Sequence, residues 1–169
     1  VVSNRPEINQ KIYMPNSNNY IDLPDLIRYL HSFGFSLRLT CVCCKNMMDT
    51  VDKVEEFINF AKKNKVEQVT LRPVNDEYRR KSAQEWIKEN RLTDEQKTKI
   101  REFLEKKGTK LLELERIGTV YDVDGQNVCL SLPLNKNTRD TNSENARNLI
   151  FFQDGHIRYE WEMEGGILL

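Results

Sequence analysis

Residues 37–74 carry the pattern that most constrains the fold of this chain. The alternating run from Leu37 to Cys44 is rich in strand formers and predicts one strand, and residues 66–74 predict a second. Between them, apolar residues at helical spacing predict a helix from about Thr50 to Lys63. A strand–helix–strand unit of this kind connects parallel strands, so the sequence predicts an α/β fold.

The same alternation extends toward the N-terminus. Asp22 can cap a helix that has Pro24 in its first turn and ends at Gly34. The apolar pair Val1-Val2 resembles the end of a buried strand, and we therefore expect the chain to belong to a longer protein.

Two helices and a set of antiparallel strands are predicted in the remainder. Residues 76–90 are charged and helical in pattern, and Thr93 with Gln96 forms a capping box for a helix that ends at Gly108. Beyond Lys110 the period changes to that of strands, and Asp-Gly pairs at 124–125 and 154–155 predict two hairpins. We thus expect three segments: part of an α/β barrel at 1–75, a helical segment at 76–109, and C-terminal antiparallel strands with a tail at 110–169.

The charge balance excludes some classes of function. The 26 basic residues equal the 26 acidic ones, which removes the net attraction that a nonspecific binder of nucleic acid or membrane surfaces uses. The sequence has no stretch apolar and long enough for a membrane span, so we expect no membrane partner. Disulfide pairing among the closely spaced Cys41, Cys43 and Cys44 would be strained, so we expect a cytoplasmic protein in a reducing environment.

The cysteines predict buried thiols rather than a metal site or a disulfide framework. Cys41 and Cys43 project to one face of a regular strand and Cys44 to the other, so the three do not converge on one ion. Cys129 is far from the other three cysteines in the sequence. A thiol-based redox protein would instead need an exposed, acidic thiol in this group.

Polar side chains on the two parallel strands mark the candidate site. Arg38 and Thr40 on the first strand, and Thr70 and Arg72 on the second, point away from the face that packs under helices. In a barrel that second face is the lumen, and Arg72 lies near the carboxyl end, where α/β barrels place their active sites. The arginines either bind an anionic or zwitterionic ligand there, or pair with carboxylates elsewhere in the fold, or lie at an exposed edge.

Three stretches of this sequence resemble the radical S-adenosylmethionine enzyme family. Residues 3–13 look like the segment after that family's fourth barrel strand, and Leu37 to Val42, with the helix and Val69 to Val74, looks like its fifth and sixth strand units. Residues 148–155 are similar to the strand and Asp-Gly turn at family C-termini. The resemblance covers most of residues 1–75 and, more loosely, 117–169.

The resemblance implies the C-terminal part of a partial (βα)6 barrel, formed by parallel βαβ units and followed by helices and an antiparallel meander. It implies an oxidoreductase or activase that uses a [4Fe–4S] cluster and S-adenosylmethionine to generate a 5′-deoxyadenosyl radical. The cluster-binding Cys-x3-Cys-x2-Cys loop is absent from this sequence, so we expect this chain alone to be inactive and to hold no cofactor.

The resemblance also implies roles for four residues. Ser3 would lie near the ribose or methionine part of S-adenosylmethionine, Arg38 and Thr40 would face its amino-acid or ribose end, and Arg72 would face cofactor or substrate. We expect the open barrel edge at the first strand to promote self-association. The alternative function is a noncatalytic α+β module that binds protein or RNA through the C-terminal strands and the basic run 78–81.

Overall fold

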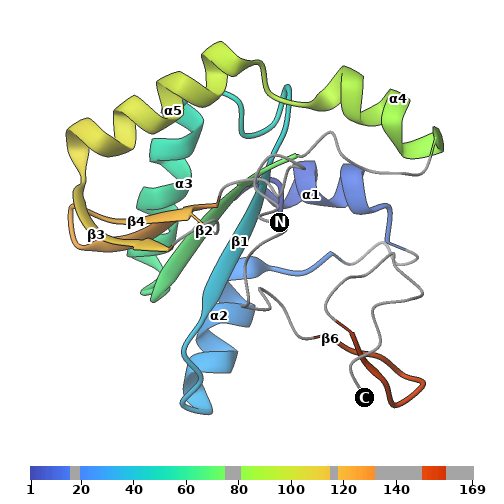
Figure 1. Ribbon diagram of the computed structural model, residues 1–169. Helices are drawn as coiled ribbons and strands as arrows, with labels where there is room; N and C mark the ends of the chain where they lie inside the picture. The colour runs from blue at the N-terminus through green and yellow to red at the C-terminus, as the bar shows by residue number, and fades with distance from the viewer. Residues whose placement is uncertain (16–19, 75–80, 115–117, 132–149, 159–169) are drawn as a thin grey trace. The chain divides into compact units, whose positions relative to one another are not determined.

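The computed structural model describes residues 1–15, 20–74, 81–114, 118–131 and 150–158, and the chain divides into two compact units, Val1–Lys136 and Asn137–Leu169. The first unit contains one five-stranded mixed sheet in the order β1-β2-β5-β4-β3 (Figure 1). Its strands are β1 Arg38–Cys43, β2 Gln68–Pro73, β3 Thr109–Leu114, β4 Gly118–Val123 and β5 Gln126–Ser131.

The predicted βαβ unit is confirmed. β1 and β2 pair in parallel, and α3 (Val51–Lys63) connects them. Thr50 caps α3 by accepting a hydrogen bond from the Lys53 N–H, and Asp22 caps α2 (Leu23–Ser32) in the same way through the Asp25 N–H.

Three further helices belong to the first unit. α5 (Asp94–Lys107) begins with the predicted capping box of Thr93 and Gln96 and is followed by Gly108. α4 (Lys81–Asn90) falls within the predicted helical range. α1 (Pro6–Tyr13) was not predicted, although Pro6 stands at the first helical position, where proline is favoured.

The C-terminal strands join the sheet of the βαβ unit. β3, β4 and β5 form the predicted antiparallel set, with the turn at Asp124-Gly125, but β5 also pairs in parallel with β2. The edge of β2 offers unpaired backbone N–H and C=O groups, and β5 satisfies them. In the second unit, β6 (Ile150–Phe151) and β7 (Ile157–Arg158) form a short hairpin across the predicted Asp154-Gly155 turn.

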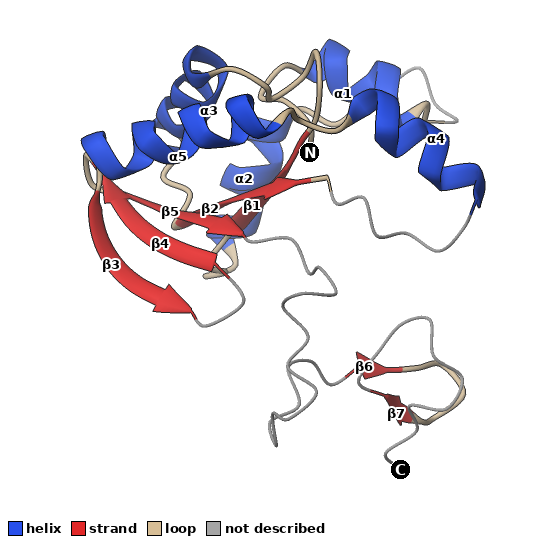
Figure 2. Cartoon of the chain, turned by 45° about the horizontal axis from the view of Figure 1, so that its top comes forward, coloured by secondary structure: helices blue, strands red, loops and turns tan. Residues whose placement is uncertain are grey.

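Helices α2, α3 and α5 cover one face of the sheet, whereas α4 lies to the side of it (Figure 2). Phe57 and Val54 of α3 and Leu104 of α5 are fully buried against Cys41 and Val69 of the strands. Among the described residues, no helix packs on the opposite face. The fold is therefore α/β with a mixed open sheet.

The N-terminal residue continues the sheet beyond β1. The Val1 amino group donates to the Thr40 carbonyl at 3.0 Å, and the Val42 N–H donates to the Val1 carbonyl at 2.9 Å. This pattern is that of a parallel bridge between Val1 and Cys41. The first residue is thus paired as a strand residue, as the apolar Val1-Val2 pair predicted.

Two helices end in the same hydrogen-bonded motif with different residues at its left-handed position. After α3, the Val66 N–H donates to Ala61 O and the Lys65 N–H donates to Lys62 O, both at 3.0 Å. Lys65 has φ 58°, whereas Gly34 takes the equivalent place after α2 with φ 79°. A lysine in this conformation is strained because its Cβ crowds the backbone.

Replacing Lys65 by glycine should relieve this strain. We expect Lys65→Gly to raise the free energy of unfolding by about 0.5–1 kcal/mol, measured by urea denaturation. Gly34→Ala is the matched control: a Cβ at Gly34 meets no atom within 4 Å, so any loss of stability there reports backbone conformation alone. Equal stability of both variants and the wild type would contradict the conclusion that Lys65 is strained in its left-handed conformation.

Candidate functional site

The face of the sheet on which no described helix packs carries most of the polar side chains of its three parallel strands. Strand register places these residues side by side, because Thr40 pairs with Thr70 and Thr70 pairs in turn with Cys129. We call this surface the polar face. Its members are Arg38, Thr40, Gln68, Thr70, Arg72, Asn127, Cys129 and Ser131.

The two arginines stand at opposite ends of the polar face. Arg38 is the first residue of β1 and pairs with Gln68, whereas Arg72 pairs with Val42 near the carboxyl ends of the strands. Four residues of extended chain separate the two levels, or roughly 13 Å along the sheet. The sequence correctly predicted that Arg38 and Arg72 lie on one face of the sheet, but their positions are at opposite ends of that face.

Both guanidinium groups are available to a ligand. Arg38 and Arg72 are exposed, and within the described part of the chain no carboxylate forms an ion pair or hydrogen bond with either. The alternative in which the arginines pair with carboxylates of the fold thus finds no support among the described residues, whereas their exposure agrees with the alternative of an exposed edge.

Contacts within the polar face link β2 to β5. Gln68 Nε2 donates to Asn127 Oδ1 at 2.5 Å, directly across the two strands. Burial raises the pKa of the Cys129 thiol, and the positive charge of Arg38 opposes this rise.

Ser3 lies in a turn that a buried asparagine organises. Asn9, only 2% exposed, accepts hydrogen bonds from the N–H groups of Val2 and Ser3 at 2.9 and 3.2 Å. Its amide donates to the carbonyls of Ser3 and Arg5 at 2.7 and 3.3 Å. The Ser3 hydroxyl accepts from the Arg5 N–H at 3.1 Å, so the Ser3 side chain helps to shape this turn.

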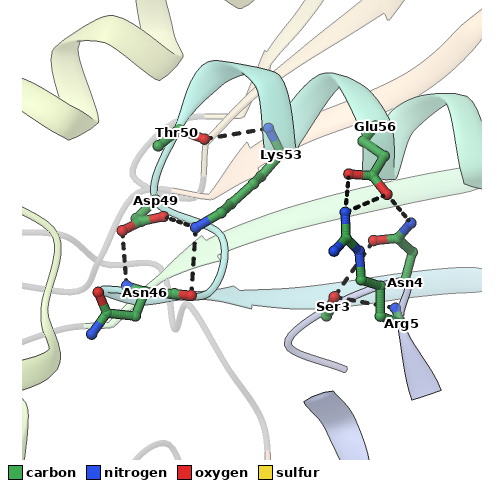
Figure 3. A network of polar contacts seen from close by, with 8 residues as sticks. All are labelled: Ser3, Asn4, Arg5, Asn46, Asp49, Thr50, Lys53 and Glu56. Atoms are coloured by element: carbon green, nitrogen blue, oxygen red, sulfur yellow. Dashed lines mark hydrogen bonds and ion pairs between the residues drawn. The ribbon is translucent and has the colours of Figure 1, made fainter. Parts of the chain in front are cut away.

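Ion pairs and hydrogen bonds attach this turn to α3 (Figure 3). Arg5 Nη2 contacts both Glu56 carboxylate oxygens at 3.3 and 3.1 Å, and Asn4 Nδ2 donates to the same carboxylate at 3.0 Å. Hydrogen bonds from Asn4 and then Arg5 lower the pKa of Glu56. The turn that follows Val1-Val2 is thereby fixed against the helix that follows β1.

The loop between β1 and α3 is held by a second group of contacts (Figure 3). Asp49 accepts from the Asn46 N–H at 2.8 Å and from Lys53 Nζ at 2.6 Å, and Lys53 Nζ also reaches the Asn46 carbonyl at 3.4 Å. Asn46 adopts a left-handed conformation, with φ 66°. The loop at the carboxyl end of β1 is thus internally braced.

The cysteines are buried, as predicted. Cys41 and Cys43 lie on the helix-covered face, and all four thiols are free. The hydrogen bond with Cys41, followed by burial, raises the pKa of Cys43 well above its usual value, and burial raises that of Cys44. This environment differs from the exposed, acidic thiol that a redox protein would need.

The described residues offer no set of ligands for a metal centre. No group of three or more His, Cys, Asp or Glu side chains comes together in the described part of the chain, so these residues do not fit an iron–sulfur cluster. No helix in the described ranges is both long and apolar enough to cross a membrane.

Sequence reasoning missed Asn9 as an organiser of the N-terminal turn. The available signal was Pro6 at a helix start with a polar residue on the buried side of the following turn. The basic run 78–81 of the alternative function lies outside the described residues, apart from the backbone of Lys81. Comparison of the chain with family models, curated proteins and solved structures finds no match.

Removing the Asn9 side chain should destabilise the fold strongly. Asn9→Ala leaves the Val2 and Ser3 N–H groups buried without their acceptor, and we expect a loss of about 2–4 kcal/mol in the free energy of unfolding. Asn4→Ala removes an exposed amide of the same chemistry and should change it by less than about 0.5 kcal/mol. Similar losses for the two variants in urea denaturation would show that Asn9 does not organise the turn.

The four thiols should react slowly while the chain is folded. Because they are buried, we expect iodoacetamide at mildly alkaline pH to modify them at least about tenfold more slowly than in denaturant, as followed by mass spectrometry. Rapid modification of any one thiol in the folded chain, with the far-UV circular dichroism spectrum unchanged, would contradict this expectation.

Proposed function

We propose that this chain forms the C-terminal half of the partial α/β barrel of a radical S-adenosylmethionine enzyme, and that the polar face lines its lumen. The proposal would make the protein an oxidoreductase or activase whose radical chemistry starts from S-adenosylmethionine. The observation that carries it is the polar face itself. A parallel sheet in a doubly covered α/β fold has apolar residues on both faces, whereas the polar face of β1, β2 and β5 is mostly polar, with Val42 and Cys129 as exceptions.

The sheet has features that a barrel half requires. Val1, β1, β2 and β5 run in parallel, with helices on one side only among the described residues. Barrel closure would need further parallel strands on the Val1 side of β1. The proposal assigns those strands to residues outside this sequence.

Arg72 is the residue best suited to the carboxylate of S-adenosylmethionine. A guanidinium can bind a carboxylate through two parallel hydrogen bonds, and Arg72 is exposed and stands near the carboxyl ends of the strands. Thr40 and Thr70 lie one step further along the same face and supply hydroxyl groups for a ribose or amino group. Arg38, at the amino end, suits a second anionic group at the far end of the lumen.

The proposal places the iron–sulfur cluster outside this chain, since the described residues do not fit one. When bound elsewhere in the protein, the cluster would supply the electron that cleaves S-adenosylmethionine. The residues of this chain would bind and orient that cofactor and exclude water from it. Ser3 would contribute from the turn beside β1, where its hydroxyl already accepts one hydrogen bond.

The test is formation of 5′-deoxyadenosine by a protein in which this chain is preceded by a segment with the three-cysteine loop. The protein would be reconstituted anaerobically with iron and sulfide, reduced, and mixed with S-adenosylmethionine. We expect Arg72→Ala to raise the half-saturating concentration of S-adenosylmethionine about tenfold, because a charge-assisted pair is lost. Thr40→Val should have a smaller effect in the same direction.

Arg28→Ala is the matched control, since Arg28 is an exposed arginine on α2 whose partner is Asp25 of the same helix. It should leave the half-saturating concentration unchanged. Absence of product, or absence of any encoded three-cysteine loop, would overturn the radical enzyme proposal and leave a noncatalytic binding module. Product formation that is insensitive to Arg72→Ala would overturn only the assignment of the polar face.

A further inference from the structure

β3 forms one edge of the sheet and presents an exposed strand. Its first five residues, Thr109 to Glu113, are all exposed, and Leu111 and Leu112 are 54% and 53% exposed. One side of β3 pairs with β4, and among the described strands none pairs with the other side. A long edge strand with exposed leucines is a template for pairing with another strand.

A bulge sets the charge pattern of this edge. Lys110 pairs with Tyr121 and Leu112 pairs with Val120, so Leu111 is the extra residue. Because of this insertion, Lys110 and Glu113 share one face of the sheet although they are three residues apart. Their side chains form an ion pair within the strand.

The resulting pattern is self-complementary. Lys110 and Glu113 are placed symmetrically about the midpoint between Leu111 and Leu112. A two-fold axis at that midpoint, with two β3 strands antiparallel, sets each Lys110 opposite Glu113 of the second copy. It also sets Leu111 of each copy opposite Leu112 of the other.

We infer that β3 is a homodimer interface, in which two copies of this chain pair edge to edge around that axis. Opposite charges directly across two antiparallel strands stabilise their pairing, and like charges there destabilise it. The arrangement satisfies both ion pairs at once and buries four leucine side chains against one another. A two-fold interface requires a self-complementary surface of this kind.

The opposite edge of the sheet fits a second copy less well. At β1 the backbone groups of Thr40 and Val42 are already bonded to Val1. The bulge in β3 makes its backbone hydrogen bonding irregular. We therefore expect the side chains of residues 110–113 to determine which strand can pair with β3. This inference does not depend on the proposed enzymatic function.

Charge reversal tests the register directly. Size-exclusion chromatography with light scattering should give twice the chain mass of 20.0 kDa for the wild type. Lys110→Glu and Glu113→Lys should each weaken dimerisation at least about tenfold, because two like-charge pairs replace two attractive ones. The double variant K110E/E113K should recover the dimer, and an equimolar mixture of the two single variants should form a heterodimer.

Lys99→Glu is the matched control, since Lys99 pairs with Glu95 on the exposed surface of α5 and lies away from β3. It should dimerise as the wild type does, and far-UV circular dichroism should confirm that every variant is folded. A wild type that stays monomeric at about 1 mM, where even weak complexes form, would overturn the inference. So would a dimer that survives both single reversals, or single variants that fail to associate when mixed.

Discussion

The parallel pairing of β2 with β5 is the interaction on which the rest of the first unit depends. It joins the βαβ unit, formed by residues 38–73, to the antiparallel strands that follow α5. Without it each part would have an unpaired edge and half a hydrophobic core. With it, α3 and α5 cover one continuous apolar surface, and Phe57, Leu104 and Val128 are buried completely. The polar face is the other side of the same sheet, so its existence follows from that pairing.

The cysteines illustrate how the two faces of one strand acquire opposite roles. Cys41 and Cys43 alternate with Thr40 and Val42, and their thiols are buried on the helix side of the strand. A thiol is a small, weakly polar group that packs as a hydrophobe. The unusual Cys-Val-Cys-Cys run therefore contributes to the core, and the chemistry available to a ligand lies with the hydroxyl and guanidinium groups on the other face.

Much of this fold could be predicted because its signals are local. Capping residues, helical periodicity and the Asp-Gly turn at 124–125 each specify structure within a few residues, and the alternation in β1 and β2 specifies which side chains share a face. The pairing of β5 with β2 could not be predicted in this way, because it joins residues far apart in sequence and depends on which edge is free. The distance between Arg38 and Arg72 along the face could not be predicted either, because it depends on the register between β1 and β2. Asn9 was missed because its four partners are backbone groups, and these have no sequence signature.

The two edges of the sheet, β1 and β3, differ in how readily they can pair with a further strand. At β1, Val1 already forms a parallel bridge, and Asn9 and Glu56 fix the chain that leaves it. The backbone groups of Thr40 and Val42 that face this edge are therefore already bonded. At β3 the partner strand β4 is antiparallel and the charges are arranged symmetrically, which suits a second copy. Of the two edges, β3 is therefore the one whose side chains favour pairing with a second copy.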